Sequence, residues 1–375
     1  MNIQSVDVWD ETFFTEFVNF RNKIHRDIEV SFPETNADYS RFFGPDSVFL
    51  SDFSWTAVMV KSDKVLAKGI LSWRKGTNQG NLGFLDWENN EEAAKILIKE
   101  IEQVAKKNNL TVLKTPIDLN FFVKYRIRVP GGEKPVWGEP VYPDYYHDLF
   151  EKTGFKEIGR WDTYRLKKIQ GIIDYFLKRK KLAVKPTGSH SKTKNKGLRT
   201  TIRCVRMNEW ENELKIIHQL FTEAYKNMPE FETISFEQFK VIYDDFKYII
   251  HPWYAYIVEL RGKPVGFSIN FADPLPILSQ YKGKKPNLIQ KAWIMARLRM
   301  NMSCFMIAHV GKIPGPNGEE IKGVQIQASK RIQFWGALMR KVLVTFQHTN
   351  SPSRRSFEEK SQTTYAQYVL YGKDL

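Results

Sequence analysis

The sequence predicts an α/β (α+β) protein of two tandem domains, each a mixed, mostly antiparallel sheet flanked by helices. Three observations lead to this prediction. The chain has 375 residues, 42% hydrophobic and 14% aromatic, which is enough material for two cores. A strongly basic stretch divides the chain near its middle, and motifs on one side of it recur on the other. The predicted domains are residues 1–167 and 198–375, joined by a linker over 168–197.

Composition excludes several classes of protein. Two cysteines, Cys204 and Cys304, are too few for a disulfide framework, and no Cys/His spacing fits a zinc site, so we expect no bound metal. The acidic start of the chain predicts no signal peptide. No apolar run approaches the ~20 residues that span a bilayer. We therefore expect a cytoplasmic protein without a membrane partner.

Positive charge is concentrated in and beside the linker. The formal net charge is +15, and the stretch from Lys167 to Thr200 holds eleven Lys or Arg residues and one acid. An exposed hinge explains this composition. Attraction of a phosphorylated cofactor or substrate is an alternative. Nucleic acid is not expected, because aromatic side chains that stack bases are not interleaved with the charges.

Motifs recur in the same order in the two halves. Trp55 and Trp253 each begin an apolar run that is followed by a short turn and a second apolar run, which predicts a strand pair in each half. Near the ends of the halves, three residues recur at one constant offset: Phe150, Glu151 and Tyr164 opposite Phe357, Glu358 and Tyr371. We interpret these similarities as an internal duplication.

The first half is predicted to begin with a helix over 10–27, followed by the strand pair and a strand over 81–85. A second helix is predicted over 91–107, because apolar residues recur there at helical spacing. These residues are Ala94, Leu97, Ile98, Ile101, Val104 and Ala105. Asn108 and Asn109 end this helix, and a strand is predicted over 110–113.

The second half follows the same plan. A helix over 210–227 precedes its strand pair, and a buried strand is predicted over 303–310. A glycine-rich loop follows, then a helix whose apolar face is formed by Val324, Ala328, Ile332, Trp335, Met339 and Val342. A strand over 343–346 leads to Asn350, a last helix and a last strand.

This order of elements, with these motifs, resembles the GNAT acyltransferase fold in tandem. GNAT proteins often carry the frame N-x-x-A-x-x-x-Y-E-K-x-G-F before the last helix, and the segment from Asn350 through Phe357 follows it. The segment Phe150–Phe155 follows its second part, and the strand beginning Lys263-Pro-Val-Gly is also typical. The resemblance implies an N-acetyltransferase that uses acetyl-CoA, or another acyl-CoA, as donor. The implied acceptor is an amine of a small molecule, for example an amino-polyol antibiotic such as zwittermicin A, in self-resistance.

The resemblance also implies where the donor binds. In GNAT enzymes the splayed fourth strand pairs with the pantetheine arm, and N–H groups at the start of the next helix bind the pyrophosphate. In the first half this region is acidic, from Asp86 to Glu92, so we expect that half to bind no donor and to shape the acceptor pocket. In the second half the implied donor-binding residues are Ala308, Val310, Lys312, Gly315, Gly318, Lys322, Gly323, Gln325 and Asn350. An ordinary solvent loop is the alternative for the glycine-rich part.

Acyl transfer needs a deprotonated amine and a protonated leaving thiol. His309 is the candidate base, because histidine as a residue type titrates near neutral pH. Glu223 and Asp273 are candidates to anchor a cationic acceptor. Many GNAT enzymes have a Tyr acid where this chain has Phe357, so Tyr371 is the candidate acid, with Tyr365 and Tyr368 as alternatives. A core histidine, packed aromatics and exposed acids are the structural explanations of the same residues.

Two other functions remain open at this stage. A Fem-type transferase, which uses aminoacyl-tRNA, is also built from tandem GNAT domains, and the basic linker would suit tRNA phosphates. The sequence has no room, however, for the long helical hairpin usual in that type. A non-catalytic module is the other alternative, favoured by Phe357 and by the incomplete match of the loop to the GNAT signature.

Overall fold

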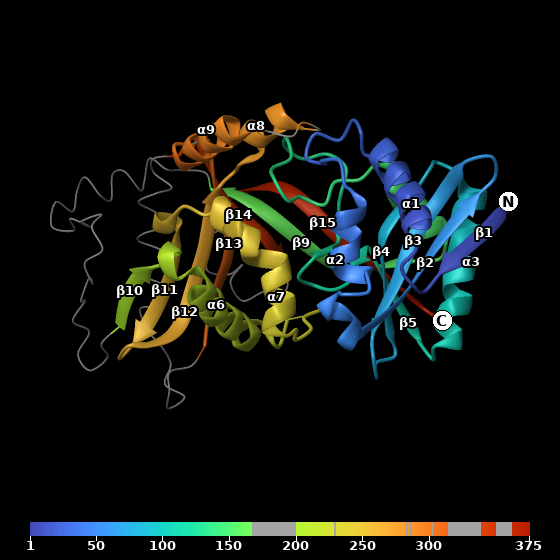
Figure 1. The fold of residues 1–375 in the computed structure, drawn as a ribbon, viewed down its shortest axis with the longest axis horizontal. Coiled ribbons are helices and arrows are strands. Elements are labelled where there is room, and N and C mark those ends of the chain that lie inside the picture. The colour runs from blue at the N-terminus through green and yellow to red at the C-terminus, as the bar shows by residue number, and fades with distance from the viewer. Residues whose placement is uncertain are drawn as a thin grey trace. The chain divides into compact units, whose positions relative to one another are not determined.

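The structure is a computed structural model that describes residues 1–166, 200–228, 230–282, 284, 287–301, 303–313, 339–349 and 362–375. The chain forms two compact units (Figure 1). Unit 1 comprises Met1–Trp161, Tyr281–Lys284 and Ala366–Leu375, and unit 2 comprises Asp162–Gln280 and Lys285–Tyr365. Both units combine strands of a mixed sheet with helices, which confirms the predicted fold class.

Unit 1 contains most of the elements of the first half. Its strands are β1 (Asn2–Val6), β2 (Phe53–Lys61), β3 (Val65–Arg74), β4 (Gln79–Trp87), β5 (Val112–Thr115), β6 (Ile117–Asp118), β7 (Lys124–Tyr125), β8 (Ile127–Arg128) and most of β9 (Lys156–Leu166). Its helices are α1 (Glu11–Ile24), α2 (Asn36–Phe43), η1 (Val48–Ser51), α3 (Glu91–Lys107) and α4 (Tyr145–Lys152). The helices predicted over 10–27 and 91–107 are thus confirmed.

The sheet of unit 1 is completed by the last strand of the chain. Strands β1 to β5 are neighbours in chain order, and only β4 and β5 are parallel. Strand β15 (Gln362–Asp374) lies antiparallel to β5, with Tyr371 opposite Thr115. Conversely, the end of β9 belongs to unit 2, where Thr163 Oγ1 accepts a hydrogen bond from Phe346 N–H at 3.2 Å. The last strand of each half therefore contributes to the unit built mainly from the other half.

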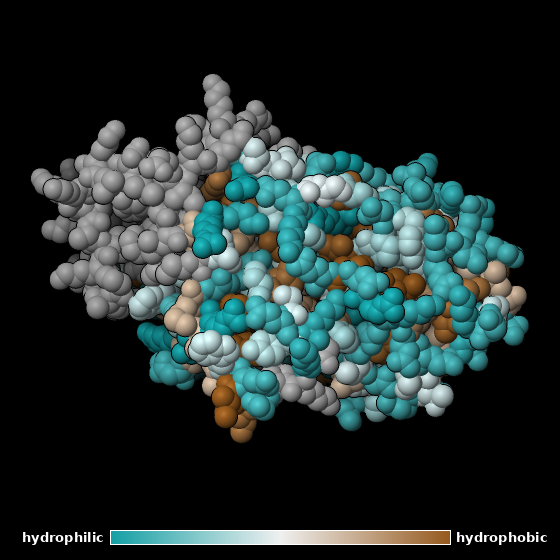
Figure 2. Space-filling view, turned by 90° about the horizontal axis from the view of Figure 1, so that it is seen from above, coloured by the Kyte–Doolittle hydropathy of each residue, from teal (hydrophilic) through white to brown (hydrophobic). Residues whose placement is uncertain are grey.

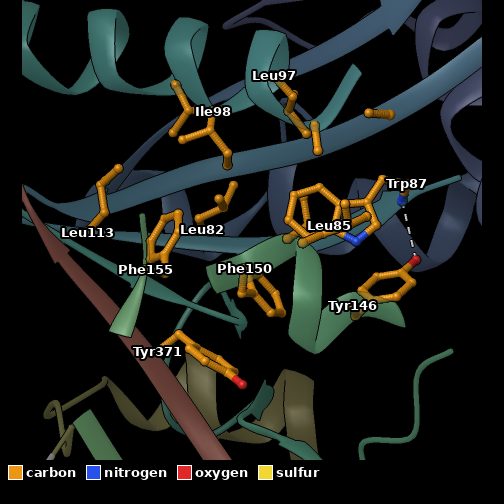
Figure 3. Close-up of a cluster of buried hydrophobic side chains, with 14 of the residues drawn as sticks. Leu82, Leu85, Trp87, Leu97, Ile98, Leu113, Tyr146, Phe150, Phe155 and Tyr371 are labelled. Carbon is orange, nitrogen blue, oxygen red and sulfur yellow. Dashed lines mark hydrogen bonds between the residues drawn. The ribbon is translucent and has the colours of Figure 1, made fainter. Parts of the chain in front are cut away.

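Helix α3 covers the core of unit 1. The Asn90 side chain accepts a hydrogen bond from Ala93 N–H and so caps the first turn. The apolar face of α3, with Leu97 and Ile98, packs toward Leu82 and Leu85 of β4 (Figure 3). The buried aromatic side chains of the same cluster are Trp87, Tyr142, Tyr146, Phe150, Phe155 and Tyr371, and all of these except Tyr142 are labelled in Figure 3. Burial of these side chains fixes the helix against the sheet.

Unit 2 repeats this arrangement. Its strands are β10 (Thr200–Cys204), β11 (Ala255–Leu260), β12 (Lys263–Ala272), β13 (Cys304–Lys312) and β14 (Lys341–His348), neighbours in the order β14-β13-β12-β11-β10. Its helices are η2 (Met207–Glu209), α6 (Trp210–Tyr225), α7 (Phe236–Tyr243), η3 (Asp244–Tyr248), η4 (Pro252–Tyr254), α8 (Leu275–Leu278), η5 (Ser279–Tyr281) and α9 (Leu288–Arg299). The helix predicted over 210–227 and the strand predicted over 303–310 are confirmed.

One boundary prediction in unit 2 is wrong. The apolar spacing placed Met339 and Val342 on a helix, but Met339 lies in a bend and Val342 lies in β14, opposite Phe305 of β13. The run from Lys341 to Phe346 is rich in β-branched residues, which pack well on a sheet, and tertiary pairing decided the outcome. The remainder of that predicted helix and the basic linker lie outside the described residues.

The membrane expectation can be compared with the helices that the structure describes. Among these, none combines the length and the apolar character that crossing a bilayer requires.

Candidate functional site

Strands β13 and β14 pair over only part of their lengths. Their parallel register joins Cys304–Ile307 to Lys341–Val344, while β13 continues to Lys312 and β14 to His348. Among the described residues, the ladder between the two strands ends after Ile307 and Val344. The two strands therefore diverge beyond this point, as the resemblance to GNAT enzymes implies for the fourth strand.

A β-bulge marks the point at which the pair ends. Ile269 of β12 lies opposite His309, and the next residue, Asn270, lies opposite Ile307, so Ala308 is an extra residue in β13. Beyond the bulge Val310 is 45% exposed, and Ala308 and His309 are half-buried. The predicted donor residues on β13, including Lys312, thus lie together on an accessible segment.

Helix α6 packs against this segment of β13. The ring of His309 meets the ring of Phe221 edge-on, with centroids 5.0 Å apart. Tyr225 at the end of α6 donates a hydrogen bond from its hydroxyl to the carbonyl of Val310 at 3.3 Å. Gly311 lets the two elements approach, since a Cβ atom there would lie 2.4 Å from Phe267 Cε1 and 2.9 Å from Ala224 Cβ. The sequence analysis missed Tyr225 and Gly311, because neither belongs to a motif.

We expect Gly311→Ala to lower the free energy of unfolding of unit 2 by about 1–3 kcal/mol, because the buried Phe267 ring has to shift. Faster hydrogen exchange in β13 and α6 would report the loss. Adding Phe267→Leu should recover part of it by making room for the new methyl group. Unchanged exchange in Gly311→Ala would show that the close approach does not matter.

The two predicted acidic anchors differ in their surroundings. Glu223 is exposed on α6 and pairs with Lys226 at 3.0 Å. Asp273 follows β12, is 5% exposed, and its Oδ1 accepts a hydrogen bond from Leu275 N–H at 3.0 Å, which begins α8. Glu223 is thus accessible to an acceptor, whereas Asp273 has a structural role in the turn.

The candidate tyrosines are buried in the two units. Tyr371 belongs to unit 1, where its hydroxyl lies 2.9 Å from His147 Nδ1 and its ring stacks on Phe150. Burial raises the pKa of Tyr371 to about 12. Tyr368, also in unit 1, donates to Glu139 at 2.6 Å, and Tyr365 in unit 2 accepts from Lys341 at 2.7 Å. The structure therefore assigns Tyr371 to a different unit from His309.

The remaining implied donor residues lie outside the described residues. These are Gly315, Gly318, Lys322, Gly323, Gln325 and Asn350, together with Phe357. Their roles stay predictions from the sequence.

In unit 1 the corresponding position on β4 is filled by the chain itself. Strand β4 pairs with β5 only through Asn81 and continues to Trp87. Strand β6 packs against it so closely that a Cβ on Gly83 would lie 2.0 Å from the carbonyl oxygen of Ile117. The Asp118 carboxylate accepts a hydrogen bond from Phe84 N–H at 2.5 Å. A backbone donor of the fourth strand is thus satisfied by the protein's own side chain.

Asp86, which we expected in the acidic region before α3, has a different place and role, and for this residue that expectation is wrong. It lies inside β4, is 2% exposed, and accepts hydrogen bonds from Lys68 Nζ at 2.8 Å and His25 Nε2 at 2.6 Å. The Tyr146 hydroxyl is a third partner at 3.1 Å. A buried carboxylate needs such partners, and these come from α1, β3 and α4. Of the predicted acids, Glu88 lies shortly before α3, and Glu91 and Glu92 lie in its first turn.

Burial and neighbouring charges explain the pKa shifts in this network. Burial would raise the pKa of Asp86, but the adjoining Lys68 and His25 outweigh burial and hold that pKa well below its ordinary value. Burial lowers the pKa of His25 and outweighs the opposing effect of the Asp86 carboxylate, which lies 2.6 Å from His25 Nε2. Lys68 also donates to the carbonyl of Phe84 at 2.9 Å and lies 3.8 Å above the Phe17 ring. Burial raises the pKa of the neighbouring Asp118.

Comparison with known proteins places this geometry in context. No family model matches the chain. Protein YghO of Escherichia coli strain K12 is 19% identical over 246 residues, which are 63% of this chain, and the match spans 57% of the length of YghO.

Solved structures match over the full chain. A tandem GNAT protein from the clavulanic acid biosynthesis pathway is 12% identical, with 100% of this chain and 98% of that chain covered and a TM-score of 0.52. A probable N-acyltransferase from Enterococcus faecalis V583 is 8% identical, covering 100% of this chain and 72% of that one, at a TM-score of 0.55. A GCN5-related N-acetyltransferase from Anabaena variabilis is 12% identical, with coverages of 99% and 72% and a TM-score of 0.50. The chain therefore has the fold of the GNAT N-acetyltransferases, in a tandem arrangement.

Proposed function

We propose that this protein is an N-acetyltransferase that takes acetyl-CoA, or another acyl-CoA, as donor and binds it in unit 2. The observation that supports the proposal best is the splayed pair of β13 and β14, with its bulge at Ala308 and with partly or fully exposed residues from Ala308 to Lys312. Where a strand diverges from its neighbour, its backbone N–H and C=O groups can pair with the amide groups of a pantetheine arm. The GNAT fold supports acyl transfer in general.

The bound donor would supply an activated acyl group as a thioester. During transfer a bond forms between the amine nitrogen and the acyl carbon, the carbon–sulfur bond breaks, and the sulfur leaves as a thiol after gaining a proton. In the proposed site His309 takes the proton that the amine gives up. Glu223, exposed on the helix that carries Phe221, would attract a cationic acceptor.

The proposed acceptor is a primary amine on a small molecule. An amino-polyol antibiotic such as zwittermicin A is one such molecule, and its acetylation would give self-resistance. A tandem protein of the same fold comes from the clavulanic acid biosynthesis pathway, which supports a search among antibiotics and their precursors. Unit 1 holds no donor in this proposal, since Ile117 and Asp118 fill the groove along β4.

The proposal predicts one donor molecule per chain. Calorimetric titration of the full-length protein with acetyl-CoA should give a stoichiometry of one. Hydrogen exchange of the complex should slow in β13, over 304–313, because the donor covers its backbone. The matched segment of unit 1, β4 over 79–87, should exchange at the same rate with and without acetyl-CoA and serves as an internal control.

Three results would contradict the proposal. Two equivalents of donor, or slower exchange in β4, would show that unit 1 also binds it. No binding of acetyl-CoA or of longer acyl-CoAs would favour a non-catalytic module.

A further inference from the structure

Unit 2 carries a helical insertion where unit 1 has a tight turn. Strands β3 and β4 are joined by residues 75–78, whereas the equivalent strands β12 and β13 are joined by residues 273–303, which contain α8 and α9. Helix α9 begins with a capping box: Asn287 Oδ1 accepts a hydrogen bond from Gln290 N–H, and Gln290 Oε1 accepts one from Asn287 N–H, both at 2.9 Å. The connection between β3 and β4 in unit 1 has no counterpart of this helix.

The outward face of α9 is apolar. Leu288 and Ile289 are each 82% exposed, Trp293 is 56% exposed, and Met300 directly after the helix is 65% exposed. Only Ile294 of this helix is buried. At 3.6 residues per turn, Ile294 lies on the side opposite to the exposed residues, so the apolar set is a continuous outward stripe. An exposed stripe of this kind marks an interaction surface.

In the sequence, the segment that carries this stripe has charges of one sign. Residues 274–318 contain seven Lys or Arg side chains and not one Asp or Glu. Lys291 and Arg299 are exposed on α9 itself. Arg297 donates a hydrogen bond to Gln280 at 2.9 Å, which ties the last turn of α9 to the segment after α8. An apolar stripe flanked by basic residues matches a surface that is negatively charged outside and apolar beneath.

We propose that the face of α9 formed by Leu288, Ile289 and Trp293 binds the surface of an anionic lipid membrane. The helix would lie in the plane of the interface, with these three side chains among the acyl chains near the headgroups. Lys291 and Arg299 would contact the lipid phosphates. Tryptophan is the residue type that favours this zone, because its ring is apolar and its N–H is polar.

A membrane explains the surface better than a second copy of the chain does. A symmetric dimer would set the same patch against itself, and Lys291 and Arg299 would then face like charges. Figure 1 shows α9 at the upper edge of the view. Figure 2 shows the described part of the face seen from above, where apolar residues in brown are scattered among hydrophilic residues in teal. The sequence analysis expected no membrane partner because no segment could span a bilayer, but binding at the surface needs no spanning segment.

Sedimentation of the full-length protein with lipid vesicles tests the proposal. We expect binding to vesicles of phosphatidylcholine with 30% phosphatidylglycerol, and at least tenfold weaker binding to phosphatidylcholine alone. The triple variant Leu288→Gln, Ile289→Gln, Trp293→Ser should bind the anionic vesicles at least tenfold more weakly. Because these side chains are exposed, the variant should fold normally, which circular dichroism checks. Val8→Gln, at an apolar residue of unit 1 that is 70% exposed, is the matched control and should bind like the parent.

The basic linker supplies a separate electrostatic attraction, and the apolar variant separates the two. Retained binding in the triple variant would overturn the proposal, because charge alone would then hold the protein. Failure of the parent protein to bind anionic vesicles would overturn it as well. So would concentration-dependent dimerisation that the triple variant abolishes, because the stripe would then join two copies of the chain.

Discussion

We expect Asp86→Asn to lower the free energy of unfolding of unit 1 by about 3–5 kcal/mol, the usual cost of breaking a buried ion pair. The substitution keeps the shape of the side chain but leaves the fully buried Lys68 ammonium without its counter-charge. It also leaves one acceptor oxygen where the carboxylate uses two, Oδ2 for Lys68 and Oδ1 for His25. Because 1.4 kcal/mol corresponds to a factor of ten, amides of β3 and β4 should exchange at least about a hundredfold faster. Exchange of unit 2 should not change.

Two further variants make this prediction specific. Glu91→Gln breaks exposed ion pairs with Lys95 and Lys152, which solvent screens, and should lower the free energy of unfolding far less than Asp86→Asn does. The double variant Asp86→Leu, Lys68→Met removes both buried charges and should be more stable than Asp86→Asn. If Asp86→Asn costs no more than Glu91→Gln, the network contributes little to the fold of unit 1.

Local signals in the sequence were sufficient for most elements. Helix α3 was predicted with its observed ends, because apolar residues recur at helical spacing and Asn108 and Asn109 follow them. Such local signals could not predict that the last strand of each half contributes to the unit built mainly from the other half. Tyr164 and Tyr371 stand in similar surroundings of sequence, and nothing local says that β15 pairs with β5 rather than with a strand of its own half.

The candidate site likewise contains residues that could be predicted from the sequence and residues that could not. The segment Ala308–Lys312 could be proposed from the sequence because its order among the strands fixes its place in the fold. The role of Asp86 could not, because its partners His25 and Lys68 are distant in sequence and become neighbours only after folding. Similarly, the closure of the groove in unit 1 depends on Asp118, which follows β5 and carries no motif.

We expect His309→Ala to lower kcat by ~10² or more, which is the usual loss when a general base is removed. An alkyl amine with a pKa near ~10 is almost wholly protonated at pH 7, so its deprotonation is the demanding step. In the parent protein the rate should rise with pH and show no steep fall until well above pH 8, because the leaving thiol needs little help at its pKa of ~8.5. In the variant the dependence on pH should become steeper, since the solvent must then accept the proton. Steady-state kinetics from pH 6 to 9, with acetyl-CoA and the best amine found, measures both effects.

The chain offers a matched control for loss of packing. His218 on α6 also packs against a phenylalanine, Phe239, with ring centroids 5.0 Å apart, and its Nε2 lies 2.9 Å from the carbonyl of Ile234. His218→Ala removes a similar aromatic contact from the same unit and should leave kcat and its pH dependence within twofold of the parent. If His309→Ala keeps full activity from pH 6 to 9, His309 serves only to pack β13 against Phe221. The exposed Glu223 is then the next residue to test as the base, because Asp273 is already bonded to Leu275 N–H in the turn before α8.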